Sequence, residues 1–146
     1  MCVLRVSSSR PSLSVFLAAE RLPYYESHAK HDPQPYGRQK GKPFGYSGFK
    51  SAVSDKEWSD LSGQIQDALR FLRRHRNALT ILRKKYGVKD MRLDFPNALR
   101  IGTKVAAQFD YFPPELILLA GELGLGIQLS LYPASTKIKS VGRKLK

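Results

Sequence analysis

The sequence predicts an α+β protein with a single antiparallel or mixed β-sheet, whose helices pack mainly on one face to form a two-layer sandwich. Most of the predicted strands alternate apolar and polar side chains, which is typical of a sheet with one solvated face. Three other segments repeat apolar residues at helical spacing. With 146 residues, of which 42% are hydrophobic, the chain is long enough for one core.

Strands and helices are predicted to alternate along the chain. The predicted strands are residues 2–6, 24–30, 46–53, 88–95, 101–109 and 127–132. The predicted helices are residues 13–21, 54–86 and 113–123. In the first half, Leu4 and Val6 give the first strand an apolar face, and Pro23 ends the first helix. Residues 31–45 contain three prolines and three glycines, so a loop is expected there, and loops of this length are often functional.

One long basic helix is the clearest local prediction. Ser54 and Glu57 have the spacing of a capping box, and the apolar stripe that follows begins at Trp58. Gly87 is placed to end the helix. At 1.5 Å per residue this helix would be roughly 48 Å long, which exceeds the diameter of a small domain. We therefore expect a break or a projecting end near residues 74–77.

The second half of the chain gives weaker but consistent signals. The strand over 88–95 alternates strictly, with inward residues Met91, Leu93 and Phe95 and outward residues Asp90, Arg92 and Asp94. Alternation over 101–109 is weaker. The pair Pro113 and Pro114 begins the last helix, and Gly124 ends it. Residues 1–135 are thus predicted to form one domain, and 136–146 a basic, disordered tail whose removal would leave the fold intact.

Positive charge is concentrated in a few segments. The net charge is +13, from 25 Lys and Arg against 12 Asp and Glu. Residues 70–104 have a net charge of +9, residues 137–146 of +5 and residues 28–50 of +4. Such a field selects for anionic partners.

Two segments are candidate binding sites for such a partner. The basic residues expected on the outer side of the long helix are Arg70, Arg73, Arg74, Arg76, Arg83, Lys84 and Lys85. The Pro/Gly-rich loop interleaves bases with aromatic residues, and its candidates are Tyr36, Arg38, Lys40, Lys42 and Phe44. Aromatic stacking combined with charge is typical of single-strand binding, although these aromatic side chains could equally anchor the loop to the core.

No catalytic or metal-binding constellation is predicted, and we expect neither enzyme activity nor a cofactor. His28 and His31 lack the further ligands that a metal site needs, so we expect them to be solvated. The glycines at 121, 124 and 126 follow a helix, which is the reverse of the order in a dinucleotide-binding loop. A single cysteine and the lack of a long apolar run favour a cytoplasmic protein without a membrane span.

Two blocks of the sequence resemble a bacterial family catalogued as domain of unknown function four-two-seven-nine. The first runs from Ser47-Gly-Phe49 through Val53-Ser-Asp-Lys-Glu-Trp58, and the second from Phe112-Pro-Pro-Glu-Leu116 through Leu129-Ser-Leu-Tyr132-Pro133. The resemblance implies a small, stand-alone, cytoplasmic α+β protein. It implies no catalytic or binding residues, and the basic helix and tail lie outside its pattern.

Two functions fit these observations. The first is a non-catalytic protein that binds an acidic protein partner, for example in a toxin-immunity or adaptor role. The alternative is nucleic-acid binding through the basic helix over 70–85, the loop over 36–46 and the tail. A groove with exposed aromatic residues would favour nucleic acid, and a flat basic patch would favour protein.

Overall fold

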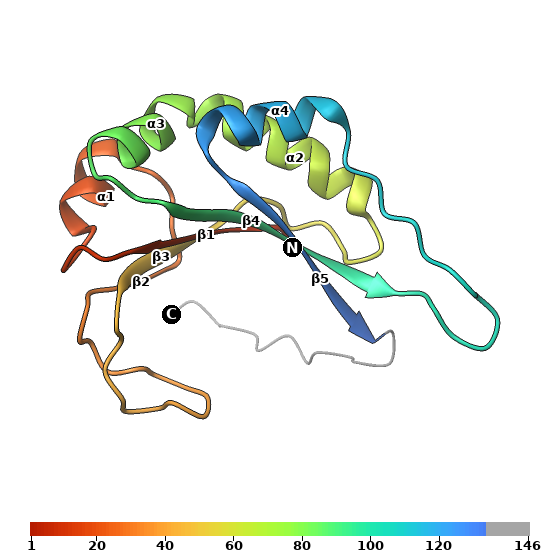
Figure 1. Cartoon of the computed structure of the whole chain (residues 1–146), viewed down its shortest axis with the longest axis horizontal. Helices are drawn as coiled ribbons and strands as arrows, with labels where there is room; N and C mark the ends of the chain where they lie inside the picture. The colour runs from red at the N-terminus through yellow and green to blue at the C-terminus, as the bar shows by residue number, and fades with distance from the viewer. Residues whose placement is uncertain (134–146) are drawn as a thin grey trace, which may run out of the picture.

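The computed structural model describes residues 1–133 and confirms the predicted fold class (Figure 1). The strands are β1 (Val3–Ser8), β2 (Glu26–His28), β3 (Ser47–Ala52), β4 (Asp90–Leu99) and β5 (Gly126–Pro133). The helices are α1 (Ser14–Glu20), α2 (Leu61–Arg74), α3 (Arg76–Lys84) and α4 (Pro114–Leu123). The predicted domain boundary at 135 and the basic tail over 136–146 lie outside the described residues.

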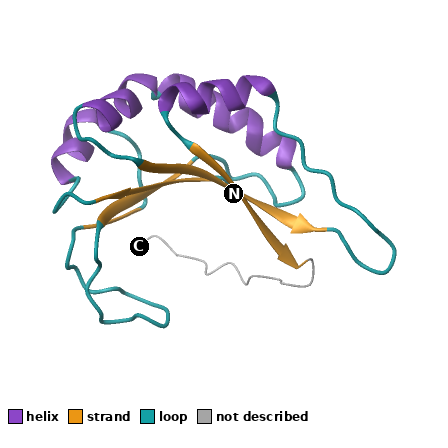
Figure 2. Cartoon of the chain, viewed as in Figure 1, coloured by secondary structure: helices purple, strands orange, loops and turns teal. Residues whose placement is uncertain are grey.

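The five strands form one mixed sheet in the order β2-β3-β1-β4-β5. Neighbouring strands are antiparallel except β4 and β5, which run parallel because α4 lies between them in the chain. All four helices lie on one side of the sheet, and loops surround its other face (Figure 2). The short β2 and the longer β5 are therefore the two edges.

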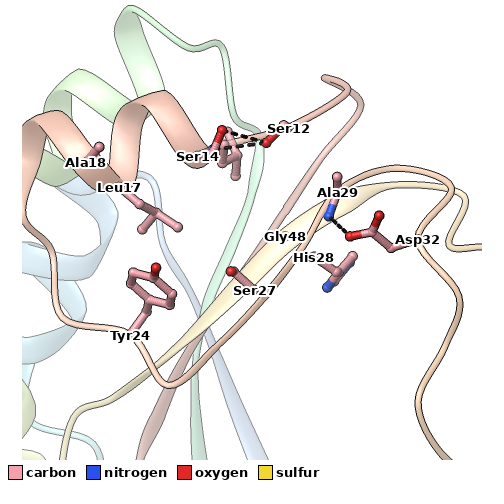
Figure 3. Close-up of a pocket in the computed structure, with 11 residues that line it drawn as sticks. Ser12, Ser14, Leu17, Ala18, Tyr24, Ser27, His28, Ala29, Asp32 and Gly48 are labelled. Atoms are coloured by element: carbon pink, nitrogen blue, oxygen red, sulfur yellow. Dashed lines mark hydrogen bonds between the residues drawn. The ribbon is translucent and has the colours of Figure 1, made fainter.

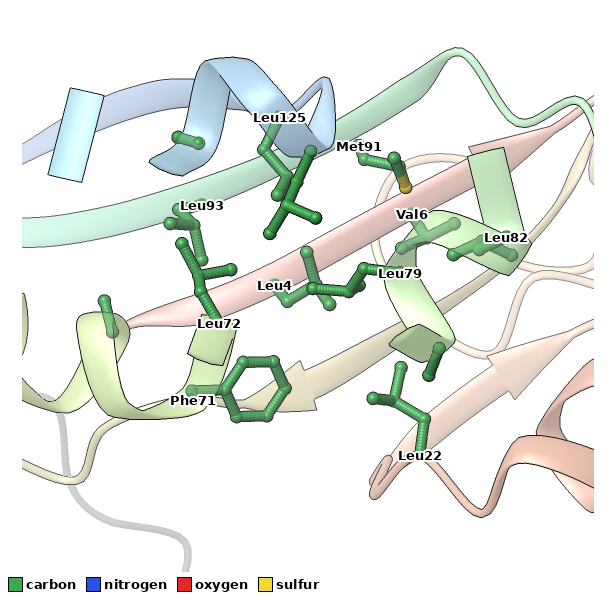
Figure 4. Packing of buried hydrophobic residues seen from close by; sticks show 14 of the residues in the cluster. Leu4, Val6, Leu22, Phe71, Leu72, Leu79, Leu82, Met91, Leu93 and Leu125 are labelled. Atoms are coloured by element: carbon green, nitrogen blue, oxygen red, sulfur yellow. The ribbon is translucent and has the colours of Figure 1, made fainter. Parts of the chain in front are cut away.

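The core lies between the sheet and the helices, as the alternating pattern predicted (Figure 4). Leu4 and Val6 of β1 pair in register with Leu93 and Met91 of β4, and all four side chains are buried. Buried leucines of α2 and α3 pack above them. The opposite face of the sheet carries Arg5 of β1, Lys50 of β3 and Arg92 of β4, so the sheet has one apolar and one polar face.

The predicted long helix is broken, as expected, but it begins later than predicted. α2 and α3 meet at His75, within the predicted interval. The capping box was wrong, because α2 begins at Leu61 and the carboxylate of Asp60 accepts a hydrogen bond from the Gly63 N–H at 2.8 Å. Ser54 instead donates to Asp67 at 2.7 Å. Trp58 lies before the helix, and its ring stacks on that of Tyr132.

The strand predicted over 101–109 was also wrong. This segment is part of the connection between β4 and α4, and it contains only an isolated bridge between Gly102 and Val105. Its apolar side chains find no core, since Phe109 remains 89% exposed. β4 instead continues to Leu99 through Pro96. The proline is tolerated because β4 pairs with β1 only as far as Asp94, so the missing N–H of Pro96 removes no hydrogen bond to β1.

Candidate functional site

The arginines of α2 and the start of α3 are paired with acids of the same chain. Arg70 forms an ion pair with Asp67, and Arg73 forms one with Glu115 of α4. Arg76 pairs with Glu122, also on α4, over 2.8 Å. No acid offsets this cluster within residues 70–85 of the sequence, but α4 supplies two in space. These side chains therefore help to hold α4 against α2 and α3. Arg74, the remaining candidate of this stretch, is exposed.

Three segments that are distant in the sequence meet at one end of the sheet. They are residues 7–10, 28–46 and 83–92, and we refer to them together as the basic end. Ser8 of β1 pairs with Ser47, just after the second segment, and Ser7 pairs with Asp90 of the third. The Arg10 Nε donates to the Tyr86 carbonyl at 2.7 Å, which joins the first segment to the third. Figure 1 shows this end opposite the loop between β4 and α4.

The basic end holds the whole net charge of the described residues. It contains ten Lys or Arg against two Asp, a net charge of +8, and residues 1–133 also sum to +8. Outside the basic end, ten Lys or Arg face ten Asp or Glu. The bases of the basic end are Arg10, Lys30, Arg38, Lys40, Lys42, Arg83, Lys84, Lys85, Lys89 and Arg92. Within residues 1–133 the net positive charge is thus concentrated at the basic end, and the charges of the other residues sum to zero.

A groove runs through the basic end along the polar face of the sheet. Its largest hollow, about 600 Å³, is lined by residues 7–9, 45–46, 87–90 and Arg92. A hollow of about 110 Å³ adjoins it on the side of β3, and one of about 440 Å³ on the side of β5. Arg92 lines all three, so we treat them as one basic groove. Its charged lining consists of Arg5, Glu26, Lys50, Lys89, Asp90 and Arg92.

Aromatic residues of the long loop line and support this groove. The loop folds back on itself, with the Phe44 N–H donating to the Asp32 carbonyl at 2.9 Å. The ring of Phe44 stacks on His28 with centroids 3.7 Å apart, and Tyr46 meets both rings edge-on. Burial lowers the pKa of His28, so this imidazole is neutral near pH 7. Phe44 therefore anchors the loop, while Tyr46, which is 44% exposed, presents its ring to the groove.

Tyr36 lies further along the loop and is held by a polar contact. It is 61% exposed, and its hydroxyl donates to the Glu26 carboxylate at 2.8 Å. Lys50 donates to the other carboxylate oxygen of Glu26 at 2.8 Å. Burial acts to raise the pKa of Glu26, but these two hydrogen bonds outweigh it and lower that pKa overall. The ring of Tyr36 is thus fixed near β2 with one face open to solvent.

A row of basic side chains crosses the polar face of the sheet. Lys50, Arg5 and Arg92 occupy the same register position on β3, β1 and β4. The Arg5 Nε donates to Asp94 at 2.8 Å, and Arg92 donates to Gln128 at 3.2 Å. The sequence pattern placed Arg92 between Asp90 and Asp94 on the outward face of the strand. The structure instead pairs Asp94 with Arg5, and leaves Asp90 as the ionic partner of Arg92 at 3.6 Å.

A separate polar hollow of about 340 Å³ lies between α1 and the edge strand β2 (Figure 3). Ser12 and Ser14 hydrogen-bond each other and Asp32 accepts from the Ala29 N–H, whereas the buried Nε2 of His28 has no hydrogen-bond partner among the described residues. Within residues 1–133 no three His, Cys, Asp or Glu side chains are grouped so as to hold a metal ion. None of the helices in this part of the chain is long and apolar enough to cross a membrane.

Sequence reasoning missed part of the groove. Ser7, Ser8, Ser9 and Lys89 line it, yet none was a candidate, and Tyr46 was included only as the end of the candidate loop over 36–46. Each lies at an element boundary, and only the strand register shows that these boundaries meet. The run of charge from Arg83 to Arg92, five bases against Asp90, was the one local signal that pointed to this part of the groove.

Comparisons with protein-family models, with curated proteins and with solved structures give no match for this chain. The resemblance to the four-two-seven-nine family therefore stays a prediction.

Proposed function

We propose that this protein binds single-stranded nucleic acid, RNA or DNA, in the basic groove. The observation that carries the proposal is the partition of charge. The full +8 of the described residues belongs to the basic end, whose groove is lined by Tyr46, while the remainder of these residues is neutral. Nucleic acid is an abundant ligand in the cytoplasm, where we place the protein, and its phosphates match a linear positive groove.

The shape of the site favours a single strand over a duplex. The charged groove lies on an open sheet face, and no helix projects from the basic end in the manner of a major-groove reader. Open sheets bind single strands by stacking bases on aromatic side chains while Lys and Arg contact phosphates. Tyr46 and Tyr36 would supply stacking surfaces, and Lys42, Lys85 and Lys89 would supply exposed charges.

An acidic protein partner, with the immunity or adaptor role expected from the sequence, is the weaker proposal. That hypothesis depended most on the arginines of the long helix. Arg70, Arg73 and Arg76 are already paired with Asp67, Glu115 and Glu122, so an acidic partner there would have to displace carboxylates of the chain itself.

Two triple variants with equal charge loss test the proposal. One replaces Lys42, Lys85 and Lys89 of the basic end with Gln, and its matched control replaces Arg70, Arg73 and Arg76. Each lowers the net charge of the protein by three. Binding of a fluorescent mixed-sequence 20-mer is measured by anisotropy between about 50 and 300 mM salt. For single strands each phosphate contact adds about 0.7 to the slope of log affinity against log salt, so the first variant should flatten the slope by about 2. The control should leave it unchanged.

A second pair of variants tests stacking. Tyr46→Ala should weaken binding by about 1–3 kcal/mol, the usual contribution of one stacked base, while Tyr46→Phe keeps the ring and the affinity.

Equal loss from both triple variants would show that the net charge, and not the groove, attracts the strand. Absence of binding at about 50 mM salt would reject the proposal, and capture of an acidic protein that the control triple abolishes would favour the other function.

A further inference from the structure

We propose that the basic groove reads one guanine base of the bound strand, through the Asp90 carboxylate and the Arg92 guanidinium beside it. This inference rests on the proposed function and adds a base preference to it. It concerns one position of the strand, since contacts to phosphates position a nucleic acid and contacts to base edges give specificity.

Asp90 is an acid of the groove whose acceptors remain available. Glu26 and Asp94, the other acids on the polar face of the strands, each accept two hydrogen bonds from neighbouring side chains. The Asp90 side chain is 55% exposed, and its contact with Arg92 is 3.6 Å long, which is beyond hydrogen-bond distance. A carboxylate at this place repels the phosphates that the groove would bind, so it calls for a separate role.

The hollow beside Asp90 has a floor of small residues. Ser7 of β1 pairs in register with Gly48 of β3 on one side and with Asp90 of β4 on the other. Neighbouring strands lie about 4.8 Å apart, so about 10 Å separates β3 from β4. Tyr46, two residues before Gly48, lines the same hollow of about 600 Å³ as Ser7 and Asp90. A base stacked on Tyr46 would therefore lie over this floor with its outer edge toward Asp90.

Guanine is the base whose edge matches the Asp–Arg pair. Its Watson–Crick edge presents two adjacent donors, the N2 amino group and the N1–H, followed by the O6 acceptor. The two oxygens of a carboxylate accept from both donors at once, and a guanidinium beside it donates to O6. Asp90 and Arg92 are two residues apart on one face of β4, so their acceptors and donors lie next to each other in the order that guanine requires.

The other bases leave part of this pair without a partner. Adenine and cytosine each place one amino group beside a ring nitrogen that is an acceptor, and this acceptor would face the second carboxylate oxygen. Uracil and thymine have a single donor between two acceptors. A site that hydrogen-bonds its ligand discriminates against analogues that leave its polar groups unpaired. We therefore expect guanine to be bound about tenfold or more tightly than adenine at this position.

Fluorescence anisotropy with three short uridine strands tests the inference. The strands differ only in their central residue, which is guanosine, inosine or adenosine. Inosine lacks the N2 amino group of guanosine but keeps N1–H and O6, so its affinity should lie between those of the other two strands. Charge and length are the same in all three, and a difference in affinity therefore reports on the base edge alone.

Replacing Asp90 with Asn separates base recognition from charge. Asp90→Asn removes a negative charge from the groove, so the adenosine strand should bind as tightly as to the wild type or more tightly. The preference for guanosine should fall about fivefold or more, because the amide offers one acceptor in place of two. Asp32→Asn is the matched control, since Asp32 is the other acid of the basic end, lines a different hollow and as Asn keeps an oxygen for the Ala29 N–H. It should keep the preference, and thermal melts establish that both variants are folded.

The outcomes separate this inference from the proposed function. Equal affinity for the three strands would overturn the base preference and leave single-strand binding in place. A preference that survives Asp90→Asn, or that Asp32→Asn reduces equally, would also overturn it. Binding of no strand at about 50 mM salt would reject the proposed function together with this inference. Guanosine monophosphate should displace the guanosine strand only at large excess, because it lacks the neighbouring phosphates, and displacement at equal concentration would show a site for the free nucleotide instead.

Discussion

Replacing Asp94 with Ala should destabilise the protein because this carboxylate ties three strands together. Asp94 lies on β4 and is 4% exposed. One carboxylate oxygen accepts from the Arg5 Nε of β1 at 2.8 Å, and the other accepts from the Ser130 hydroxyl of β5 at 2.6 Å. Removing it breaks both cross-strand contacts on the polar face of the sheet.

The expected cost follows from these two bonds. A hydrogen bond to a charged partner contributes about 1.5–3 kcal/mol, and one from a neutral hydroxyl to the carboxylate lies near the low end of that range. The Arg5 side chain is 37% exposed, so water can solvate it in the variant and reduce the penalty. We therefore expect Asp94→Ala to lower the free energy of unfolding by about 2–3 kcal/mol, and Ser130→Ala by about 1.5 kcal/mol.

Urea unfolding followed by tryptophan fluorescence measures both values. Trp58 is the single tryptophan, and its ring stacks on Tyr132 at the end of β5 with centroids 4.6 Å apart. The signal therefore reports on the part of the sheet that Asp94 holds. Arg92→Gln is the matched control, because its 3.6 Å contact with Asp90 is exposed on both sides and should contribute less than about 1 kcal/mol.

Two results would refute this reasoning. An Asp94→Ala variant within about 0.5 kcal/mol of wild type would behave as an ordinary surface substitution. A double-mutant cycle between Arg5→Gln and Asp94→Ala with no coupling energy would show that the two groups do not interact in solution, whereas contacting residues usually couple by about 0.5–3 kcal/mol.

Two further predictions concern pH and backbone conformation. Because burial lowers the pKa of His28, the unfolded chain binds a proton more readily, so stability should fall as the pH drops below about 6.5. His28→Phe should reduce that loss in thermal melts between pH 7.5 and 5.5, and an unchanged pH dependence would contradict it. Gly124 and Gly87 both have positive φ, but only at Gly124 would a side chain meet another group, the Arg83 guanidinium 2.6 Å away. Urea unfolding should therefore show Gly124→Ala to be the more destabilising of the two alanine variants, each costing about 1 kcal/mol or more.

Local patterns in the sequence were sufficient for most of the elements. The alternation of Met91, Leu93 and Phe95 placed those side chains in the core, and β4 confirms it. The length of the predicted helix indicated a break, which is found at His75. Such patterns work because apolar periodicity records which face of an element is buried. They failed at Ser54, where the capping motif does not begin a helix. They also failed over 101–109, where the weakly alternating apolar side chains pack against no core.

The candidate site was predicted only in part. The loop bases Arg38, Lys40 and Lys42 and the end of the long helix do belong to the basic end. Arg70, Arg73 and Arg76 were grouped with them because residues 70–85 contain no acid. Arg70 pairs with Asp67, only three residues earlier. The partners of Arg73 and Arg76, Glu115 and Glu122, are about forty residues away in the chain, and no local pattern reveals them.

The sequence by itself determined the fold class, the inward faces of most strands and the sign of the protein's own net charge. These properties follow from composition and from periodicities of two and about 3.6 residues, which are local. Only the tertiary structure decided where the charge acts. Pairing of α4 acids with helix arginines neutralises one cluster, and the register of β1, β3 and β4 gathers the others around one groove. Electrostatic fields depend on distances in space, and those distances are set by which strands become neighbours.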